Sequence, residues 1–228
     1  MNIVITGSSR GIGLAAAKAF LERGHTVYGI DLLPPDPSLD GTDYRHTVAD
    51  IRDPDALPDI PEVHVLFNNA GVQNGPDDID VNLKGTISVT EKYIRRPETL
   101  RAVLFNASAS AVTGQEFPLY AAAKAGVLGY MRNTAIRLAP YGVTVNALSF
   151  GGVLTELNDP VTRDETLWNE IMRVTPLKKW MTPEEAAEWV VFLTLTNRSM
   201  SGQNLLIDNG ERDLNGTFVW PADDRQGR

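Results

Sequence analysis

The amino-acid sequence predicts a single-domain α/β fold built on a doubly wound, mostly parallel sheet. Two observations carry this prediction. Apolar runs of strand length alternate with amphipathic runs of helix length along most of the chain, and this alternation is typical of a parallel sheet with helices on both faces. The chain has 228 residues and no internal repeat, which suits one domain of this kind.

The first half of the chain contains four predicted strands and one complete helix. The strands lie at 2–6, 26–31, 44–49 and 63–68, and the helix lies at 12–23, with Gly24 as its C-cap. The connections after the second and third strands are interrupted by prolines, namely Pro34, Pro35, Pro37, Pro54, Pro58 and Pro61. Proline breaks a helix interior. We therefore expect both crossovers to be shortened to loops or single turns.

The second half continues the alternation. The predicted elements are a helix at 82–94, a strand at 102–107, a helix at 120–139, a strand at 143–148, a helix at 182–195 and a strand at 204–207. Pro140 ends the long helix. The helix at 182–195 begins with a capping box, in which Thr182 is the N-cap and Glu185 occupies the third helical position.

Composition excludes several classes of function. The 29 acidic residues outnumber the 21 basic ones, so the net charge of −8 opposes binding to nucleic acid or anionic membranes. The absence of cysteine excludes disulfides and thiolate metal sites. The three histidines have no ligand spacing, so no metal site is expected. Without a signal peptide or a membrane-length apolar run, we expect a soluble, cytoplasmic protein.

A glycine-rich turn joins the first strand to the first helix. Gly7 permits the chain reversal, while Gly11 and Gly13 let the backbone approach a pyrophosphate and the helix pack on the strand. The free N–H groups of the helix N-terminus then face the phosphates. Asp31 lies 18 residues after Gly13, at the end of the second strand, where a ribose-binding carboxylate is expected. The alternative for Asp31 is a turn residue before the prolines.

Six short motifs follow one another along the chain. They are residues 6–13 (TGSSRGIG), 68–71 (NNAG), 80–82 (DVN), 120–124 (YAAAK), 146–155 (NALSFGGVLT) and 207–210 (IDNG). In this order they resemble the short-chain dehydrogenase/reductase family. The resemblance implies one Rossmann-like NAD(P)-binding domain at 1–210, which also carries the catalytic residues, followed by a C-terminal tail at 211–228.

Tyr120 and Lys124 stand four residues apart, so they share one face of the helix at 120–139. A phenol titrates at about 10, and a nearby ammonium group should bring its pKa toward neutrality. The resemblance implies that Tyr120 is the general acid and base of a hydride-transfer reaction. It also implies that Lys124 binds the ribose of the nicotinamide.

The resemblance further implies a serine shortly before this tyrosine and an asparagine in the DVN motif. Ser108 directly follows the strand at 102–107 and lies 12 residues before Tyr120. The family commonly has 13, so one residue is missing from the loop. We assign Ser108 as the donor to the substrate oxygen, with Ser110 as the alternative. Asn82 would anchor a water molecule linked to the lysine.

The remaining cofactor contacts also come from the resemblance. Ser9, Arg10 and Ile12 belong to the glycine-rich loop. Asp50 and Ile51 would contact the adenine, and Val153 and Thr155 the carboxamide. The NNAG motif would place Ala70 and Gly71 beside the cofactor, whereas Asn69 would brace the strands. Residues 154–180 stand where the family has its substrate-binding lid, and they could equally form a subunit contact.

Two residues favour different cofactors. Arg10 is typical of family members that bind the 2′-phosphate of NADP, whereas the Asp31 carboxylate accepts hydrogen bonds from ribose hydroxyls and repels a phosphate. No Arg or Lys occurs between Asp31 and Arg45. We therefore expect the repulsion between the Asp31 carboxylate and a 2′-phosphate to decide the choice in favour of NAD(H), with NADP(H) as the alternative cofactor.

The sequence thus predicts an NAD(H)-dependent oxidoreductase that interconverts a secondary alcohol and a ketone or aldehyde. Its partner would be a small-molecule carbonyl or alcohol substrate. Small residues on the helix at 120–139 suit close helix packing, so a homo-oligomer, a tetramer or a dimer, is expected. The alternatives are an NADPH-dependent carbonyl reductase of the same fold and a cofactor-sensing regulator without catalysis.

Overall fold

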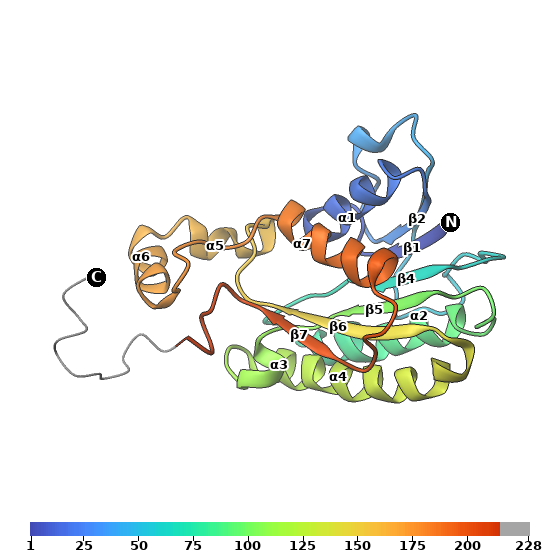
Figure 1. Ribbon diagram of the computed structural model, residues 1–228. Helices are drawn as coiled ribbons and strands as arrows, with labels where there is room; N and C mark the ends of the chain where they lie inside the picture. The colour runs from blue at the N-terminus through green and yellow to red at the C-terminus, as the bar shows by residue number, and fades with distance from the viewer. Residues whose placement is uncertain (215–228) are drawn as a thin grey trace.

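The computed structural model describes residues 1–214, and the remainder of the predicted tail, 215–228, lies outside the described residues. Its centre is one sheet of seven parallel strands in the order β3-β2-β1-β4-β5-β6-β7 (Figure 1). The strands are β1 (Asn2–Thr6), β2 (Thr26–Asp31), β3 (Tyr44–Val48), β4 (Val65–Asn68), β5 (Ala102–Asn106), β6 (Thr144–Phe150) and β7 (Asn204–Ile207). The predicted single-domain, doubly wound parallel sheet is confirmed.

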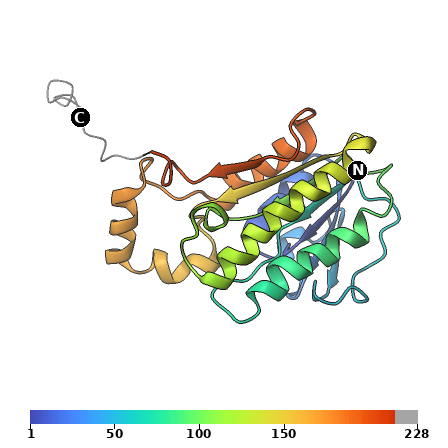
Figure 2. The same cartoon turned by 90° about the horizontal axis from the view of Figure 1, so that it is seen from below.

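Helices cover both faces of the sheet. Helices α1 (Gly11–Leu21) and α7 (Pro183–Val191) pack side by side on one face. Helices α2 (Thr86–Tyr93) and α4 (Pro118–Leu138) lie on the other, and Figure 2 shows them from below. Each face buries its own apolar cluster, so the sheet is apolar on both sides, as is usual for parallel sheets.

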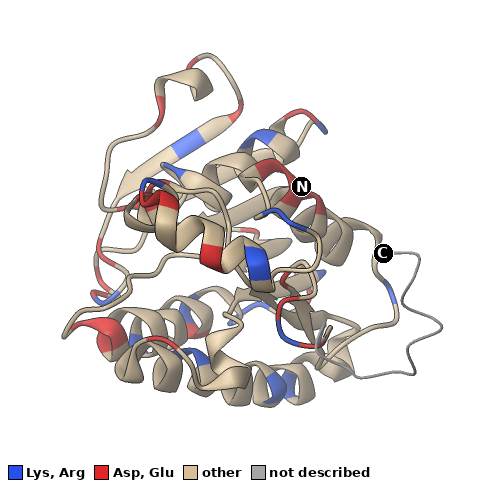
Figure 3. Ribbon diagram, turned by 90° about the vertical axis from the view of Figure 1, so that its left-hand side faces the viewer, with Lys and Arg blue, Asp and Glu red and all other residues tan. Residues whose placement is uncertain are grey.

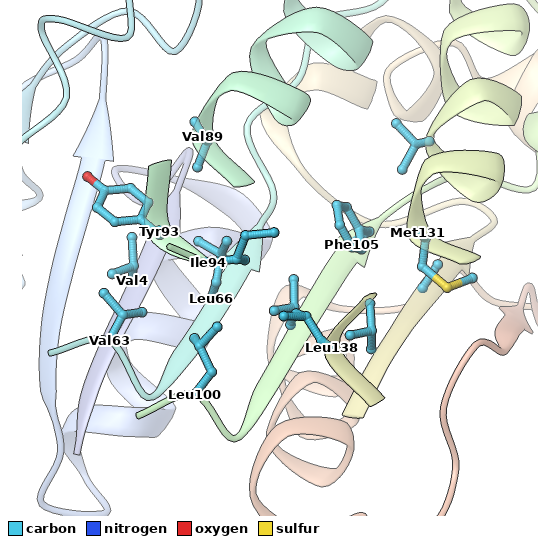
Figure 4. Packing of buried hydrophobic residues seen from close by; sticks show 14 of the residues in the cluster. Val4, Val63, Leu66, Val89, Tyr93, Ile94, Leu100, Phe105, Met131 and Leu138 are labelled. Carbon is cyan, nitrogen blue, oxygen red and sulfur yellow. The ribbon is translucent and has the colours of Figure 1, made fainter. Parts of the chain in front are cut away.

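The core beneath α2 and α4 illustrates how the elements hold together. Leu66 and Phe105 rise from neighbouring strands toward Tyr93 of α2 and Met131 of α4 (Figure 4). The ring of Phe105 also meets Tyr130 edge-on, with ring centres 5.9 Å apart. Leu66, Phe105 and Met131 are fully buried, and full burial of such a side chain stabilises the fold by about 1.5–3 kcal/mol. They fix α4 and therefore the positions of the residues along it.

Both shortened crossovers are present. Between β2 and β3 the chain forms a single 3₁₀ turn at Pro37–Leu39, which the Asp36 side chain caps by accepting from the Ser38 N–H at 2.9 Å. Between β3 and β4 it forms only turns. Leu39 and Leu57 anchor these two connections in the core.

Several helices differ from the sequence expectation. The predicted helix at 82–94 begins as a π-helical segment, Asp80–Gly85, that continues into α2, and α7 likewise ends in a π-helical segment, Phe192–Thr196. The capping box of α7 is present, with reciprocal hydrogen bonds between Thr182 and Glu185 of 3.0 and 3.2 Å. Three helices were not expected: α3 (Ser110–Thr113), α5 (Asp159–Thr162) and α6 (Glu165–Val174).

Helices α5 and α6 belong to the segment 154–180 and project from the main body (Figure 1). In Figure 3 the Lys and Arg positions are interspersed with Asp and Glu over the elements. Among residues 1–214, no helix combines the length and apolar character that crossing a bilayer requires.

Candidate active site

Two adjoining cavities lie where the parallel strands end. The strand order reverses between β1 and β4, and ligands of open α/β sheets bind at such a reversal, beside the carboxyl ends of the strands. The smaller cavity, about 320 Å³, extends from the glycine-rich loop to Asp31 and Asp50. The larger, about 510 Å³, extends from Asn82 to Tyr120. Gly71 and Asn106 line both, so the two form one cleft.

The glycine-rich loop is packed too closely for larger residues. Gly7 has φ +68°, and a Cβ atom there would lie 2.8 Å from the Cα of Ala70. A Cβ atom on Gly13 would lie only 1.9 Å from the carbonyl oxygen of Gly7. Asn69 holds the loop from the other side, because its amide donates to the carbonyls of Thr6 and Gly7 at 3.1 and 3.0 Å. Asn69 thus braces the loop.

Asp31 is oriented by backbone N–H groups. Its carboxylate accepts from Ser9 at 3.0 Å and from Leu33 at 3.0 Å. Asp31 lines the smaller cavity together with Gly11 and Arg10. Ser9 lies beneath the surface, with 8% of its area exposed.

Arg10 is paired with an acid. Its guanidinium lies 3.2 Å from the carboxylate of Glu156, with both side chains largely exposed. Among the residues that the structure describes, Arg10 is the only Arg or Lys lining the smaller cavity. The Arg10 guanidinium could bind a 2′-phosphate, but it already pairs with the Glu156 carboxylate.

The other predicted cofactor residues divide between the two cavities. Asp50, Ile51 and Ala70 line the smaller one. Asp50 is held by Arg52 through hydrogen bonds of 2.7–3.1 Å, which keep the pKa of its carboxyl below the usual range. Val153 lines the larger cavity, and Ile12, Gly71 and Thr155 line both.

The four predicted catalytic residues meet in the larger cavity. Ser108, Tyr120, Lys124 and Asn82 all line it, although they come from three separate parts of the fold. The Lys124 ammonium group donates to the carbonyl of Asn106 at 2.8 Å and lies 5.6 Å from the centre of the Tyr120 ring. Asn106 was not predicted to contribute. Asn106 contributes through its backbone carbonyl, and every residue has such a carbonyl, so the residue type gives no signal.

The electrostatics of the pair differ from the sequence expectation. The pKa of Tyr120 is raised to about 12, chiefly by burial; the Ser108 hydroxyl acts to lower it, and the charges of Glu116 and Asp78 act to raise it. Burial lowers the pKa of Lys124 to about 8, which the charge of Asp78 partly offsets. The expected shift of the phenol pKa toward neutrality is not found, because desolvation of the buried phenol dominates.

Ser108 and Ser110 both lie in the larger cavity, and they contact each other. The hydroxyl of Ser108 donates to that of Ser110 at 3.0 Å, and Ser110 in turn donates to Glu116 at 2.5 Å. Of the two, Ser108 is the serine whose hydroxyl acts on Tyr120, because it lowers the pKa of that phenol. The arrangement therefore favours Ser108 as the serine beside Tyr120, whereas Ser110 pairs with Glu116.

Asn82 lies in the π-helical segment and is completely buried. Its Oδ1 atom accepts from the Val72 N–H at 3.2 Å, and its Nδ2 atom donates to the carbonyls of Val72 and Asp78 at 2.8 and 2.9 Å. Single π-helical turns are frequent at functional sites. Asn82 thus fixes the loop at Val72 beside Lys124.

Sequence reasoning missed further residues of the larger cavity. Glu116, Trp180 and Glu211 line it, and Glu211 belongs to the segment that was expected only as a tail. The Trp180 ring occupies the space that a side chain on Gly152 would fill. No group of metal-ligating side chains occurs within residues 1–214.

Comparisons with known proteins agree with this arrangement. The family described as enoyl-(acyl carrier protein) reductase matches residues 7–211. Acetoacetyl-CoA reductase of Paracoccus denitrificans is 34% identical over 223 residues, which cover 83% of this chain and 88% of that protein.

Two solved structures share the fold. A candidate 2-deoxy-D-gluconate 3-dehydrogenase from Agrobacterium tumefaciens with bound NADP has a TM-score of 0.84 at 27% identity, and the match covers 92% of this chain and 95% of that one. A 3-oxoacyl-[acyl-carrier protein] reductase from Brucella melitensis with bound NAD has a TM-score of 0.78 at 26% identity, over 92% and 90% of the two chains.

Proposed function

The chain belongs to the short-chain dehydrogenase/reductase family of oxidoreductases, and on this premise we propose that it is an NAD(H)-dependent enzyme that interconverts a secondary alcohol and a ketone or aldehyde. One observation carries the proposal. Ser108, Tyr120 and Lys124 line a cavity that adjoins the cleft formed by the glycine-rich loop and Asp31.

The smaller cavity fits a dinucleotide. Gly7, Ala70 and Gly71 line it, and their small side chains let an extended ligand approach the backbone. The N–H groups at the start of α1 offer an anion site at one end. The carboxylate of Asp31 retains free lone pairs for ribose hydroxyls at the other. A nicotinamide held by Val153 and Thr155 would then lie in the larger cavity.

Tyr120 carries the acid–base step in this proposal. When bound, an oxidised nicotinamide supplies the hydride acceptor and a positive charge that favours the phenolate. The phenolic oxygen of Tyr120 removes the hydroxyl proton of an alcohol, or returns a proton to a carbonyl oxygen. Ser108 holds the substrate oxygen, and Lys124 binds the nicotinamide ribose and keeps positive charge near the phenol.

The preference for NAD(H) follows from Asp31. Repulsion between the Asp31 carboxylate and a 2′-phosphate a few Å away weakens NADP(H) binding by several kcal/mol, even at an effective dielectric of about 20. An exposed ion pair between Arg10 and that phosphate would strengthen NADP(H) binding by roughly 1 kcal/mol or less. Glu156 already pairs with Arg10, which reduces that gain.

The experiment combines cofactor binding with turnover. Fluorescence titration with NADH and NADPH should show tighter binding of NADH, and a panel of ketones, diketones, sugars and steroids should reveal NADH oxidation. Binding without turnover of any alcohol or carbonyl would instead support a cofactor-sensing protein. Stronger binding and turnover with NADPH would support the carbonyl reductase alternative.

The assembly and compartment are also part of the proposal. We propose that the protein is cytoplasmic. We also propose that it is a homo-oligomer, since α4 carries exposed small residues, among them Ala122, Ala125 and Gly129, that suit close helix packing. Light scattering of the purified protein tests the assembly, and a mass equal to one chain would contradict it.

A further inference from the structure

A chain of hydrogen bonds connects the edge strand β3 to the glycine-rich loop. The Ser8 hydroxyl lies 2.8 Å from the Tyr44 hydroxyl, which lies 3.0 Å from Nδ1 of His46. Nε2 of His46 lies 2.9 Å from the carbonyl oxygen of Leu33. These four residues form what we call the β3 bridge. It begins in the loop at Ser8, which is completely buried, and ends two residues beyond Asp31.

The donors and acceptors of the β3 bridge have one arrangement when His46 is neutral. The Leu33 carbonyl can only accept, so Nε2 of His46 carries the proton and Nδ1 is left as the acceptor. Tyr44 then donates to Nδ1, since burial raises the pKa of its phenol and keeps it protonated. The Tyr44 oxygen in turn accepts from Ser8. Each side chain of the bridge therefore has its partner, and the catalytic residues need none of these protons.

The backbone of β2 leaves space for the bridge. Gly29 lies opposite His46 in the pairing of β2 with β3. A Cβ atom on Gly29 would lie 2.0 Å from the Tyr44 hydroxyl oxygen and 2.5 Å from the Ser8 hydroxyl oxygen, so a larger residue would displace both hydroxyls. Glycine weakens the interior of a strand and often marks a close approach by another group. The β3 bridge is the group that approaches here.

The far end of the bridge lies beside the carboxylate that the proposed function assigns to a ribose. The N–H groups of Leu33 and Ser9 each donate to Asp31 at 3.0 Å. The Ser9 hydroxyl donates to the Leu33 carbonyl at 3.3 Å, so His46 and Ser9 hold the same carbonyl. The connection that follows is a single 3₁₀ turn instead of a crossover helix, and Leu32 and Leu33 are exposed. His46 thus supports a loop that no crossover helix covers.

We propose that Tyr44 and His46 are positioning residues that orient Asp31 for the hydroxyls of the adenosine ribose; the inference rests on the proposed function. Neither belongs to the described residues that line the smaller cavity, whereas Leu33 and Asp31 do. The bridge acts through Leu33. By holding this residue at its carbonyl, it fixes the N–H group that orients the Asp31 carboxylate.

Tyr44→Phe tests the bridge at its centre. Phenylalanine keeps the ring and removes the hydroxyl, which leaves Ser8 and Nδ1 of His46 without that partner. The dissociation constant for NADH, measured by fluorescence titration, should rise by about tenfold. At saturating NADH kcat should not fall, because the catalytic residues line the other cavity. The matched control is Tyr28→Phe, since the Tyr28 hydroxyl on β2 accepts from Arg45 at 3.0 Å instead of from a bridge residue. It should bind NADH as wild type does.

Two cofactor fragments show whether the effect reaches Asp31. ADP carries the ribose hydroxyls from which Asp31 would accept, and 2′,3′-dideoxy-ADP lacks them. In calorimetric titrations, Tyr44→Phe should bind ADP about tenfold more weakly than wild type and the dideoxy compound within about twofold of wild type. An equal loss for both compounds would mean that the substitution loosens the loop as a whole, and it would overturn the positioning role.

Two substitutions of His46 test the other half of the bridge. His46→Gln keeps an N–H group that can donate to the Leu33 carbonyl, whereas His46→Leu keeps only an apolar side chain. His46→Leu should weaken ADP binding as much as Tyr44→Phe does, and His46→Gln should recover most of that loss. Thermal melting of each variant verifies that it is folded. Equal ADP binding by the glutamine and leucine variants would contradict the role of the bond to Leu33.

The outcomes also separate this inference from the proposed function. If wild type binds NADH and ADP and Tyr44→Phe binds both equally well, the positioning role alone is overturned. A wild-type protein that binds neither NADH nor ADP would overturn the proposed function and the positioning role together.

Discussion

The ammonium group of Lys124 lies 5.6 Å from the centre of the Tyr120 ring, one helical turn away, and donates its hydrogen bond to the Asn106 carbonyl. Lys124 therefore acts on the phenol through space, while its position is fixed by the end of β5. Burial outweighs this effect, since the pKa of Tyr120 rises to about 12.

Lys124→Ala should lower both turnover and cofactor affinity. The lysine has two roles in the account, one at the phenol and one at the nicotinamide ribose, and alanine removes both. Steady-state kinetics and NADH titration of the same preparation measure the two effects separately. Unchanged NADH affinity in this variant would show that the ribose contact is wrong.

Lys124 should also make stability depend on pH. Its pKa falls from 10.5 to about 8 on folding, so between these values the unfolded chain binds more protons than the folded one. The free energy of unfolding should then rise with pH through this window, by roughly 3 kcal/mol in total. Lys124→Met should lack this rise. Urea unfolding of both proteins between pH 7.5 and about 10.5 measures the difference. If the free energy of unfolding changed with pH in the same way in both proteins, the lowered pKa of Lys124 would be contradicted.

Ser108→Ala should lower kcat more than Ser110→Ala does. In the proposed function Ser108 donates to the substrate oxygen, and loss of one donor to a developing oxyanion costs about 10²–10³ in rate. Ser110 contacts Ser108 and Glu116 rather than Tyr120 in this structure, so its loss should lower kcat less. The reverse ranking of the two variants would transfer the substrate contact to Ser110.

Asp31→Ser should narrow or reverse the preference for NAD(H). The substitution removes the charge that repels a 2′-phosphate and keeps a hydroxyl for the ribose. We expect wild type to favour NAD(H) by about tenfold or more in kcat/KM, which corresponds to only about 1.4 kcal/mol. Arg10 lies beside the same cavity, so a wild-type preference for NADPH would mean that Arg10 prevails over both Asp31 and Glu156.

Local sequence signals predicted the parts of the fold that depend on local chemistry. Apolar runs located the strands, prolines located the shortened crossovers, and Thr182 with Glu185 located the start of α7. The glycine-rich loop could also be predicted, because its glycines stand where larger residues cannot fit. A Cβ atom on Gly13, for example, would collide with the Gly7 carbonyl. The family motifs then brought Tyr120, Lys124 and Asn82 to one site.

Contacts between distant residues could not be predicted in this way. Arg10 meets Glu156 across 146 residues of sequence, and neither residue type signals the other. Helices α5 and α6 went unpredicted because their apolar residues stand in a mainly polar segment. Glu116 resembles any loop acid in sequence, and only its backbone conformation and its contact with Ser110 distinguish it.

Tyr120→Phe tests the central claim most directly. Phenylalanine keeps the ring in its buried place and removes only the transferable proton, so turnover should fall by several orders of magnitude while NADH binds with near-normal affinity. The measurement is NADH oxidation with a carbonyl substrate that wild type reduces, together with an NADH titration. Residual turnover above about a tenth of wild type would contradict the assignment of Tyr120 as the general acid and base.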